Sequence, residues 1–172
     1  MRKIVLSILI ASISFSYLIA AKSQEQDKDS DKTELNFFTG MLDFSDDTQA
    51  AGVFGLQHQN DDLFRNSFFG KISPITGGFF TEKSAFYLYT GAQAEYNLGL
   101  FKITPSFAPG FYNSGNGKDL GSILEFKSEI QMSLNLSDST EFGMSYNHIS
   151  NASLGDKNPG ANSYMINFVK QF

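Results

Sequence analysis

The sequence predicts an all-β protein, an eight-stranded antiparallel up-and-down transmembrane β-barrel preceded by a cleavable signal peptide. Three observations support this fold class. The chain begins with two basic residues and a long apolar run, most of the remainder alternates between apolar and polar residues, and the last strand-like segment ends in Phe172. Alternation with a period of two places apolar side chains on one face of a strand and polar side chains on the other.

The composition narrows the class of protein further. The chain has 172 residues, which favours a single domain, and it contains 18 Phe and 7 Tyr but no Cys. This aromatic content argues against a disordered chain, and the lack of cysteine excludes disulfides and thiolate metal sites. A formal net charge of -5 argues against a nucleic-acid partner, because nucleic acids attract a basic face.

Residues 1–23 are expected to form the signal peptide. Arg2 and Lys3 supply its positive charge, residues 4–21 are apolar apart from serine and tyrosine, and small residues follow where a signal peptidase would cut. The alternative is an uncleaved membrane anchor, since the apolar run reaches the lower end of the roughly 17–25 residues that span a bilayer.

The next segment, residues 24–34, is polar, charged and without periodicity. Such a composition does not bury enough apolar surface to fold, so we predict a disordered periplasmic tether. The barrel domain is then expected to occupy residues 35–172.

Eight segments of this domain alternate, and residues 120–136 are the most regular. Their even positions, beginning at Leu120, are mostly apolar, and their odd positions include Glu125, Lys127 and Glu129. This length exceeds the roughly 5–6 residues of a typical soluble strand and satisfies the roughly 9–11 that cross a membrane. We predict strands over residues 35–44, 50–58, 64–75, 86–96, 101–111, 120–136, 142–150 and 162–172.

The other seven segments alternate with differing regularity, and the first three are the least regular. In residues 86–96 the even positions are mostly apolar, and the odd positions include glutamine and glutamate. In residues 101–111 the phenylalanines occupy odd positions, whereas in residues 142–150 and 162–172 the aromatic residues share the even positions. Each of these strands therefore has one apolar face.

The polar face distinguishes a membrane barrel from a soluble fold. A secreted lipocalin-like barrel or a β-sandwich would turn its apolar face inward, and the charged face would then lie outside. In a membrane barrel Glu125, Lys127 and Glu129 point into the lumen, where we expect a structural charge network. Side chains fill the interior of an eight-stranded barrel, so no pore is expected.

The lengths of the loops predict how the barrel is oriented in the membrane. Residues 97–99 and 137–139 form short turns, whereas residues 113–119 and 151–161 form longer loops rich in Asn, Gly and Asp. Outer-membrane barrels combine short periplasmic turns with longer outer loops, and an even number of strands places both termini in the periplasm. We therefore predict an integral outer-membrane protein, surrounded by outer-membrane lipids.

A candidate site lies at the outer end of the seventh strand. His148 and Ser150 continue the even, lipid-facing positions of Tyr146, and a hairpin that placed Ser150 opposite Asn162 would gather all three polar residues on the outer wall. Polar groups facing lipid cost free energy unless they are paired or lie at the interface. A serine beside a histidine suggests a nucleophile and its base, although such residues also occur at strand ends without chemistry.

The run from His148 to Asn162, His-Ile-Ser-Asn-Ala-Ser-Leu-Gly-Asp-Lys-Asn-Pro-Gly-Ala-Asn, resembles the lipid A 3-O-deacylase (PagL-like) or acyloxyacyl hydrolase family. The resemblance extends over residues 86–172. It implies an outer-leaflet esterase that removes the ester-linked 3-hydroxyacyl chain of lipid A in lipopolysaccharide, without metal or cofactor. It also implies these roles: Ser150 as nucleophile, His148 as base, and Asn151 and Asn158 in shaping the site and stabilising the oxyanion.

One position departs from the family pattern. Asn162 stands where the family has a glutamate as the third catalytic member. An amide can accept a hydrogen bond from the imidazole, but it supplies no negative charge, and an acid-to-amide change in a serine triad can cost about 10⁴ in kcat. Asp156 is a candidate substitute. The alternative hypothesis is a catalytically inactive or weakened barrel with a structural or lipid-binding role, and the sequence leaves homodimer formation open.

Overall fold

The computed structural model describes residues 33–46, 48–60, 64–68 and 70–172. The predicted signal peptide and nearly all of the predicted tether lie outside these residues. Within them, no helix is long and apolar enough to cross a membrane. The strands are β1 (Thr33–Leu42), β2 (Ala51–Asn60), β3 (Arg65–Ser67), β4 (Gly70–Thr81), β5 (Phe86–Leu98), β6 (Phe101–Asn113), β7 (Leu124–Ser137), β8 (Thr140–Ser150) and β9 (Ala161–Gln171).

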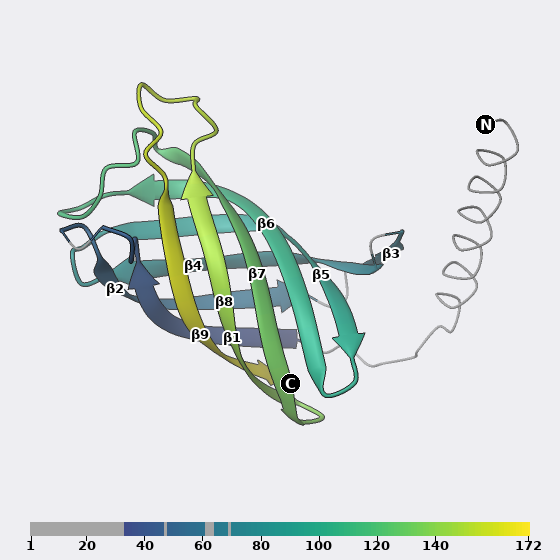
Figure 1. The fold of residues 1–172 in the computed structure, drawn as a ribbon. Helices are drawn as coiled ribbons and strands as arrows, with labels where there is room; N and C mark the ends of the chain where they lie inside the picture. Colours follow the sequence, from purple (N-terminus) through teal and green to yellow (C-terminus); the bar gives the residue numbers. More distant parts are fainter. Residues whose placement is uncertain (1–32, 47, 61–63, 69) are drawn as a thin grey trace, which may run out of the picture.

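The eight long strands form a closed antiparallel barrel (Figure 1). Each long strand pairs with the next one along the chain, β1 also pairs with β9, and β2 pairs with β4. The three-residue β3 pairs only with the start of β4. The predicted eight-stranded barrel is therefore confirmed, with β3 as an addition at its edge.

Side chains alternate between a polar interior and an apolar wall. In β8 the odd residues Glu141, Ser145 and Asn147 are buried, whereas the even residues Phe142 and Met144 are exposed. The same alternation holds along β7, where the predicted inward positions are buried or half-buried and most of the outward ones are exposed. The interior holds buried polar and charged side chains beside a cluster of buried apolar ones, and the exposed apolar belt around it is what a bilayer requires.

Three predicted boundaries were wrong. The predicted strand over residues 64–75 is in fact β3 and β4, separated near Gly70, whose φ of 91° interrupts an extended chain. Gly77 and Gly78 have no side chains to alternate, so they hide the pattern by which the far end of β4 would be recognised. The first strand begins at Thr33, so the predicted tether loses Thr33 and Glu34 to β1.

Leu120 was also wrongly assigned to a lipid-facing strand. It has the same parity as the outward residues of β7, but Gly121, with a φ of 92°, breaks the chain before β7 begins at Leu124. The Leu120 side chain is 0% exposed and belongs to the cluster of buried apolar residues. It therefore packs under the loops at one end of the barrel instead of facing lipid.

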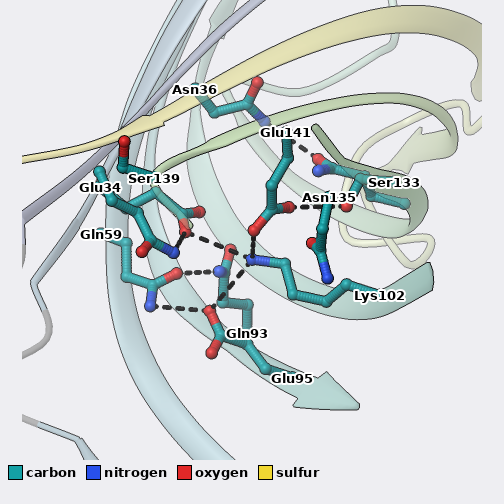
Figure 2. Close-up of polar contacts among 12 residues, drawn as sticks. Glu34, Asn36, Gln59, Gln93, Glu95, Lys102, Ser133, Asn135, Ser139 and Glu141 are labelled. Atoms are coloured by element: carbon teal, nitrogen blue, oxygen red, sulfur yellow. Dashed lines mark hydrogen bonds and ion pairs between the residues drawn. The ribbon is translucent and has the colours of Figure 1, made fainter. Parts of the chain in front are cut away.

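A buried charge cluster joins distant strands at the other end. Lys102 Nζ lies 2.7 Å from Glu141 Oε1, 3.3 Å from Glu34 Oε2 and 3.7 Å from Glu95 Oε1 (Figure 2). Farther along the interior, Lys127 Nζ pairs with Glu129 at 3.4 Å. Of the three residues expected to form an internal charge network, Lys127 and Glu129 are thus paired in the lumen, and a second cluster forms around Lys102.

Candidate active site

The candidate site lies where β8 ends and β9 begins. The loop between them, residues 151–160, projects at the end of the barrel away from the C-terminus (Figure 1). Tyr146, His148 and Ser150 occupy successive outward positions of β8, with Tyr146 exposed and the other two half-buried. Successive outward positions of a strand lie about 6–7 Å apart, so their side chains can meet on the outer wall.

The structure brings His148 and Asn162 into contact. The two residues are direct partners in the β8–β9 ladder, and His148 Nδ1 lies 2.8 Å from Asn162 Oδ1. An amide oxygen only accepts hydrogen bonds, so this contact requires the imidazole proton on Nδ1. The other ring nitrogen, Nε2, then carries the lone pair that a base needs.

Ser150 is not opposite Asn162, which corrects the expected hairpin register. The β8–β9 pairing continues only as far as Ile149 and Ala161. Gly160, with a φ of 61°, leaves the extended conformation and ends the ladder there. Ser150 instead has Phe126 of β7 as its partner, and it shares the outward face of β8 with His148. Among the described residues, no hydrogen bond joins the Ser150 hydroxyl to the imidazole.

Gly160 also allows the loop to approach the imidazole. A Cβ atom built on this residue would lie 2.8 Å from His148 Cε1 and 3.2 Å from His148 Nε2. Any other residue type would therefore push against the ring in addition to straining the backbone. Glycine at this position keeps the loop in contact with the ring edge that carries Nε2.

Tyr146 contacts the same amide oxygen as the imidazole. Its hydroxyl donates a hydrogen bond to Asn162 Oδ1 at 2.8 Å. Its ring packs against that of Tyr164, with centroids 5.3 Å apart, and Tyr164 packs in turn against Phe44 at 4.4 Å. The amide of Asn162 is thus held by partners on β8, within a group of aromatic rings.

Asn151 anchors the loop instead of facing the outer wall. Its side chain is 0% exposed, and its Nδ2 atom donates hydrogen bonds of 2.8 Å to the carbonyl oxygens of Leu120 and Lys157. Its backbone N–H donates to Asn158 Oδ1 at 3.1 Å. These bonds occupy the side-chain and backbone donors of Asn151, whereas Asn158 uses only its oxygen and is exposed.

A charged pair links the same loop to its neighbour. Lys157 Nζ lies 2.8 Å from Asp119 Oδ2, and both side chains are exposed. Hydrogen bonds from Lys157 and from the backbone N–H of Gly121 lower the pKa of Asp119 below its usual value. Asp156, the candidate substitute acid, is exposed, and the described residues show no hydrogen bond between it and the imidazole.

A model of the lipid A 3-O-deacylase (PagL) family matches residues 15–171, which is most of the chain. The chain belongs to this family. No curated protein sequence matches it at a significant level. Family membership therefore comes from the family model, and the expected resemblance is confirmed over a longer stretch than the one that suggested it.

Solved structures show the same fold. The crystal structure of the outer membrane enzyme PagL matches with a TM-score of 0.63 and 20% identity, covering 80% of this chain and 98% of that one. A de novo designed transmembrane β-barrel matches with a TM-score of 0.52 and 9% identity, covering 82% and 95%. Neisserial surface protein A matches with a TM-score of 0.51 and 9% identity, covering 82% and 96%. The fold is that of outer-membrane barrels.

Sequence reasoning missed two contributors to this PagL-family site. Tyr146 was identified only as an outward aromatic residue, because its contact with Asn162 depends on the strand register. Gly160 appeared only as one residue of the loop 151–161, although a glycine that follows proline and directly precedes a strand signals an unusual φ. In the described part of the chain, no group of His, Cys, Asp and Glu residues is arranged to hold a metal ion.

Proposed function

We propose that this barrel is an outer-membrane esterase that hydrolyses the ester-linked 3-hydroxyacyl chain of lipid A. The observation that carries the proposal is the 2.8 Å contact between His148 Nδ1 and Asn162 Oδ1 on the outer wall, beside Ser150 and within a member of the PagL family. A histidine whose Nδ1 is held by an acceptor has its Nε2 free to act as a base.

The proposed reaction has two steps. Ser150 Oγ attacks the ester carbonyl while His148 Nε2 takes the hydroxyl proton, and that proton passes to the sugar oxygen as its bond to the acyl carbon breaks. A water molecule, deprotonated by the same imidazole, then attacks the acyl-serine, which releases the 3-hydroxy fatty acid and regenerates Ser150. Asn162 keeps the imidazole oriented in both steps.

The surroundings of Ser150 suit an acyl ester. Phe126, its ladder partner, stacks on Phe107 with ring centroids 5.9 Å apart and an interplanar angle of 11°. Both phenylalanines belong to the outward face, so an acyl chain in the leaflet would meet an aromatic surface beside the hydroxyl. Asn158 retains its amide N–H groups for the oxyanion, whereas Asn151 serves by holding Asn158 and the loop in place.

The position of the site along the barrel fits an outer-leaflet substrate. The site is at the end of the barrel away from the C-terminus, and bacterial outer-membrane barrels keep their termini in the periplasm. We therefore infer export by the signal peptide of residues 1–23, insertion in the outer membrane and a site that faces the outer leaflet, with lipopolysaccharide as the substrate.

The alternative is an inactive or weakened member of the family with a structural or lipid-binding role. Asn162 is the observation in its favour, because a neutral amide does not stabilise an imidazolium as a carboxylate does. This reading predicts a folded barrel that leaves lipid A unchanged.

Mass spectrometry of lipid A tests the proposal in Gram-negative cells that express the native chain or Ser150→Ala. We expect the native chain to remove one 3-hydroxyacyl group and Ser150→Ala to leave lipid A intact, although both run as folded barrels on a gel without heating. Ser128→Ala is the matched control, because Ser128 of β7 faces outward directly beside His148. If Ser128→Ala lost activity and Ser150→Ala kept it, the nucleophile would be a residue other than Ser150. If the native chain and both variants left lipid A unmodified, the result would support the alternative of an inactive barrel.

A further inference from the structure

We propose that Tyr146 is a positioning residue that makes an asparagine serve as the third member of the site. Its hydroxyl holds the Asn162 amide with the oxygen, not the NH₂ group, toward His148. The inference rests on the proposed esterase activity. It gives a positioning role to Tyr146, a residue that takes no part in the proton transfer between Ser150 and His148.

An asparagine has two nearly isosteric ends with opposite hydrogen-bonding character. If the NH₂ group faced Nδ1, the imidazole would keep its proton on Nε2 and would be unable to accept the proton of Ser150. The loss of about 10⁴ in kcat that follows an acid-to-amide change in a serine triad is attributed to this wrong tautomer. An asparagine site therefore needs a second partner that selects one orientation of the amide.

Tyr146 provides that partner from the neighbouring strand. Asn162 Oδ1 lies 2.8 Å from the Tyr146 hydroxyl and 2.8 Å from His148 Nδ1, so its two lone pairs accept one hydrogen bond each. If the amide were reversed, the Tyr146 hydroxyl hydrogen would lose its acceptor. On a wall that faces lipid, an unmatched donor carries a free-energy cost, so the reversed amide is disfavoured.

The tyrosine ring is itself held in place. It packs against Tyr164, its partner across the β8–β9 ladder, and Tyr164 packs against Phe44. Among the described residues, the Tyr164 hydroxyl makes no hydrogen bond. Of these two adjacent tyrosines, Tyr146 donates a hydrogen bond to the Asn162 amide and Tyr164 does not.

A carboxylate in the same place would not need this help. Glutamate has two equivalent acceptor oxygens and no donor, so either oxygen keeps the imidazole proton on Nδ1. The Tyr146 hydroxyl should therefore matter in the native chain and lose most of its importance in an Asn162→Glu variant. A merely structural role for Tyr146 predicts the same effect in both backgrounds.

The first experiment measures kcat and KM for lipid A deacylation in four proteins: native, Tyr146→Phe, Asn162→Glu and the double variant. We expect Tyr146→Phe to lower kcat about tenfold in the native background, which is roughly the factor that one hydrogen bond supplies, with little change in KM. In the Asn162→Glu background the same change should alter kcat by less than about twofold. Tyr164→Phe is the matched control and should leave kcat unchanged.

The second experiment reads the imidazole directly and does not depend on activity. The chain has two histidines, so His58→Gln leaves His148 as the only one, and the ¹⁵N shifts of its ring report the tautomer when recorded at about pH 8.5. We expect the Nδ1–H tautomer in this background and a shift toward Nε2–H when Tyr146→Phe is added. This shift without any deacylation would overturn the proposed function and support the positioning role. The positioning role would be overturned if the tautomer of His148 were the same with and without Tyr146→Phe. It would also be overturned if Tyr146→Phe changed kcat equally in the native and Asn162→Glu backgrounds.

Discussion

At the scale of single residues, the site depends on how closely the backbone of Gly160 approaches the His148 ring. A Cβ atom at this position would lie 2.8 Å from the ring, and the φ of 61° is one that side chains rarely adopt. The same glycine ends the β8–β9 ladder, so it determines both the register of His148 with Asn162 and the space around Nε2.

Gly160→Ala is therefore expected to damage the site more than the fold. The left-handed φ should cost about 1–2 kcal/mol of unfolding free energy, and displacement of the imidazole should lower deacylation on the order of 100-fold. Gly99→Ala is the control, because Gly99 has a φ of 74° and nothing lies within 4 Å of its Cβ position. Urea unfolding and lipid A analysis on both variants check the prediction, which fails if the two lose activity equally.

Sequence reasoning selected His148, Ser150 and Asn162 as candidate site residues, first as polar residues on the outer wall of the barrel and then through the family resemblance. It placed the first two on the outward face of a strand, and the structure agrees. It paired Asn162 with Ser150, two residues away from the actual partner His148, because the register of a hairpin depends on where each strand ends, and Gly160 determines that end. The contact between Asn162 and Tyr146 follows from this register, so the sequence alone could not predict it.

At the scale of elements, the β8–β9 loop is held by the loop before β7. Asn151 reaches across to the Leu120 carbonyl, and Lys157 pairs with Asp119 on the surface. One of these contacts is buried and independent of pH, whereas the other depends on an ionised carboxylate. The two contributions can therefore be separated by lowering the pH.

The loop should loosen in acid because of Asp119. Its pKa is lowered in the folded protein, so the contribution of its pair with Lys157 is present above the ordinary value of 3.8 and is lost as the pH falls through the folded pKa. We expect native residues 151–160 to exchange amide hydrogens more slowly than those of Asp119→Asn at pH 5, and the difference to shrink as the pH falls below the ordinary value of 3.8 and Asp119 becomes protonated. Hydrogen exchange at each pH measures this, and a difference that does not change with pH contradicts it.

Element boundaries were harder to predict than element identity. The long alternating segments were assigned correctly as strands, because a period of two survives even at exposed positions. The errors at residues 64–75 and at Leu120 both occur beside a glycine of positive φ, Gly70 or Gly121. Alternation continues in the sequence across such a glycine although the strand does not, and the pattern alone contains no sign of the break.

At the scale of the whole molecule, the barrel buries a lysine among three glutamates. Lys102 of β6 pairs with Glu95 of the neighbouring β5, and also with Glu34 of β1 and Glu141 of β8, two strands that are not adjacent to β6 in the sheet (Figure 2). Lys102 occupies an even position of residues 101–111, opposite the phenylalanine face, but the alternation gives no indication of these partners. Such contacts depend on closure of the whole barrel and not on any one hairpin.

Lys102→Met should destabilise the barrel strongly. Removing the only cation of this cluster leaves buried carboxylates that repel one another, and breaking a buried ion pair typically costs about 3–5 kcal/mol. Lys102→Arg is the control that retains the charge, and adding Glu141→Gln to Lys102→Met should recover part of the loss. Urea unfolding of the refolded barrel in vesicles at neutral pH measures the change, and an unaltered midpoint would refute it.

The filled barrel and the outward position of His148 together determine how the proposed esterase would meet a lipid substrate. A ligand does not enter from bulk water through the lumen, because paired side chains occupy it. In the proposed esterase, substrate would instead reach Ser150 laterally, by diffusion in the two dimensions of the leaflet. The rate of an esterase of this kind should follow the mole fraction of its lipid in the leaflet, so it should fall under surface dilution by inert lipid even when the total amount of substrate is constant.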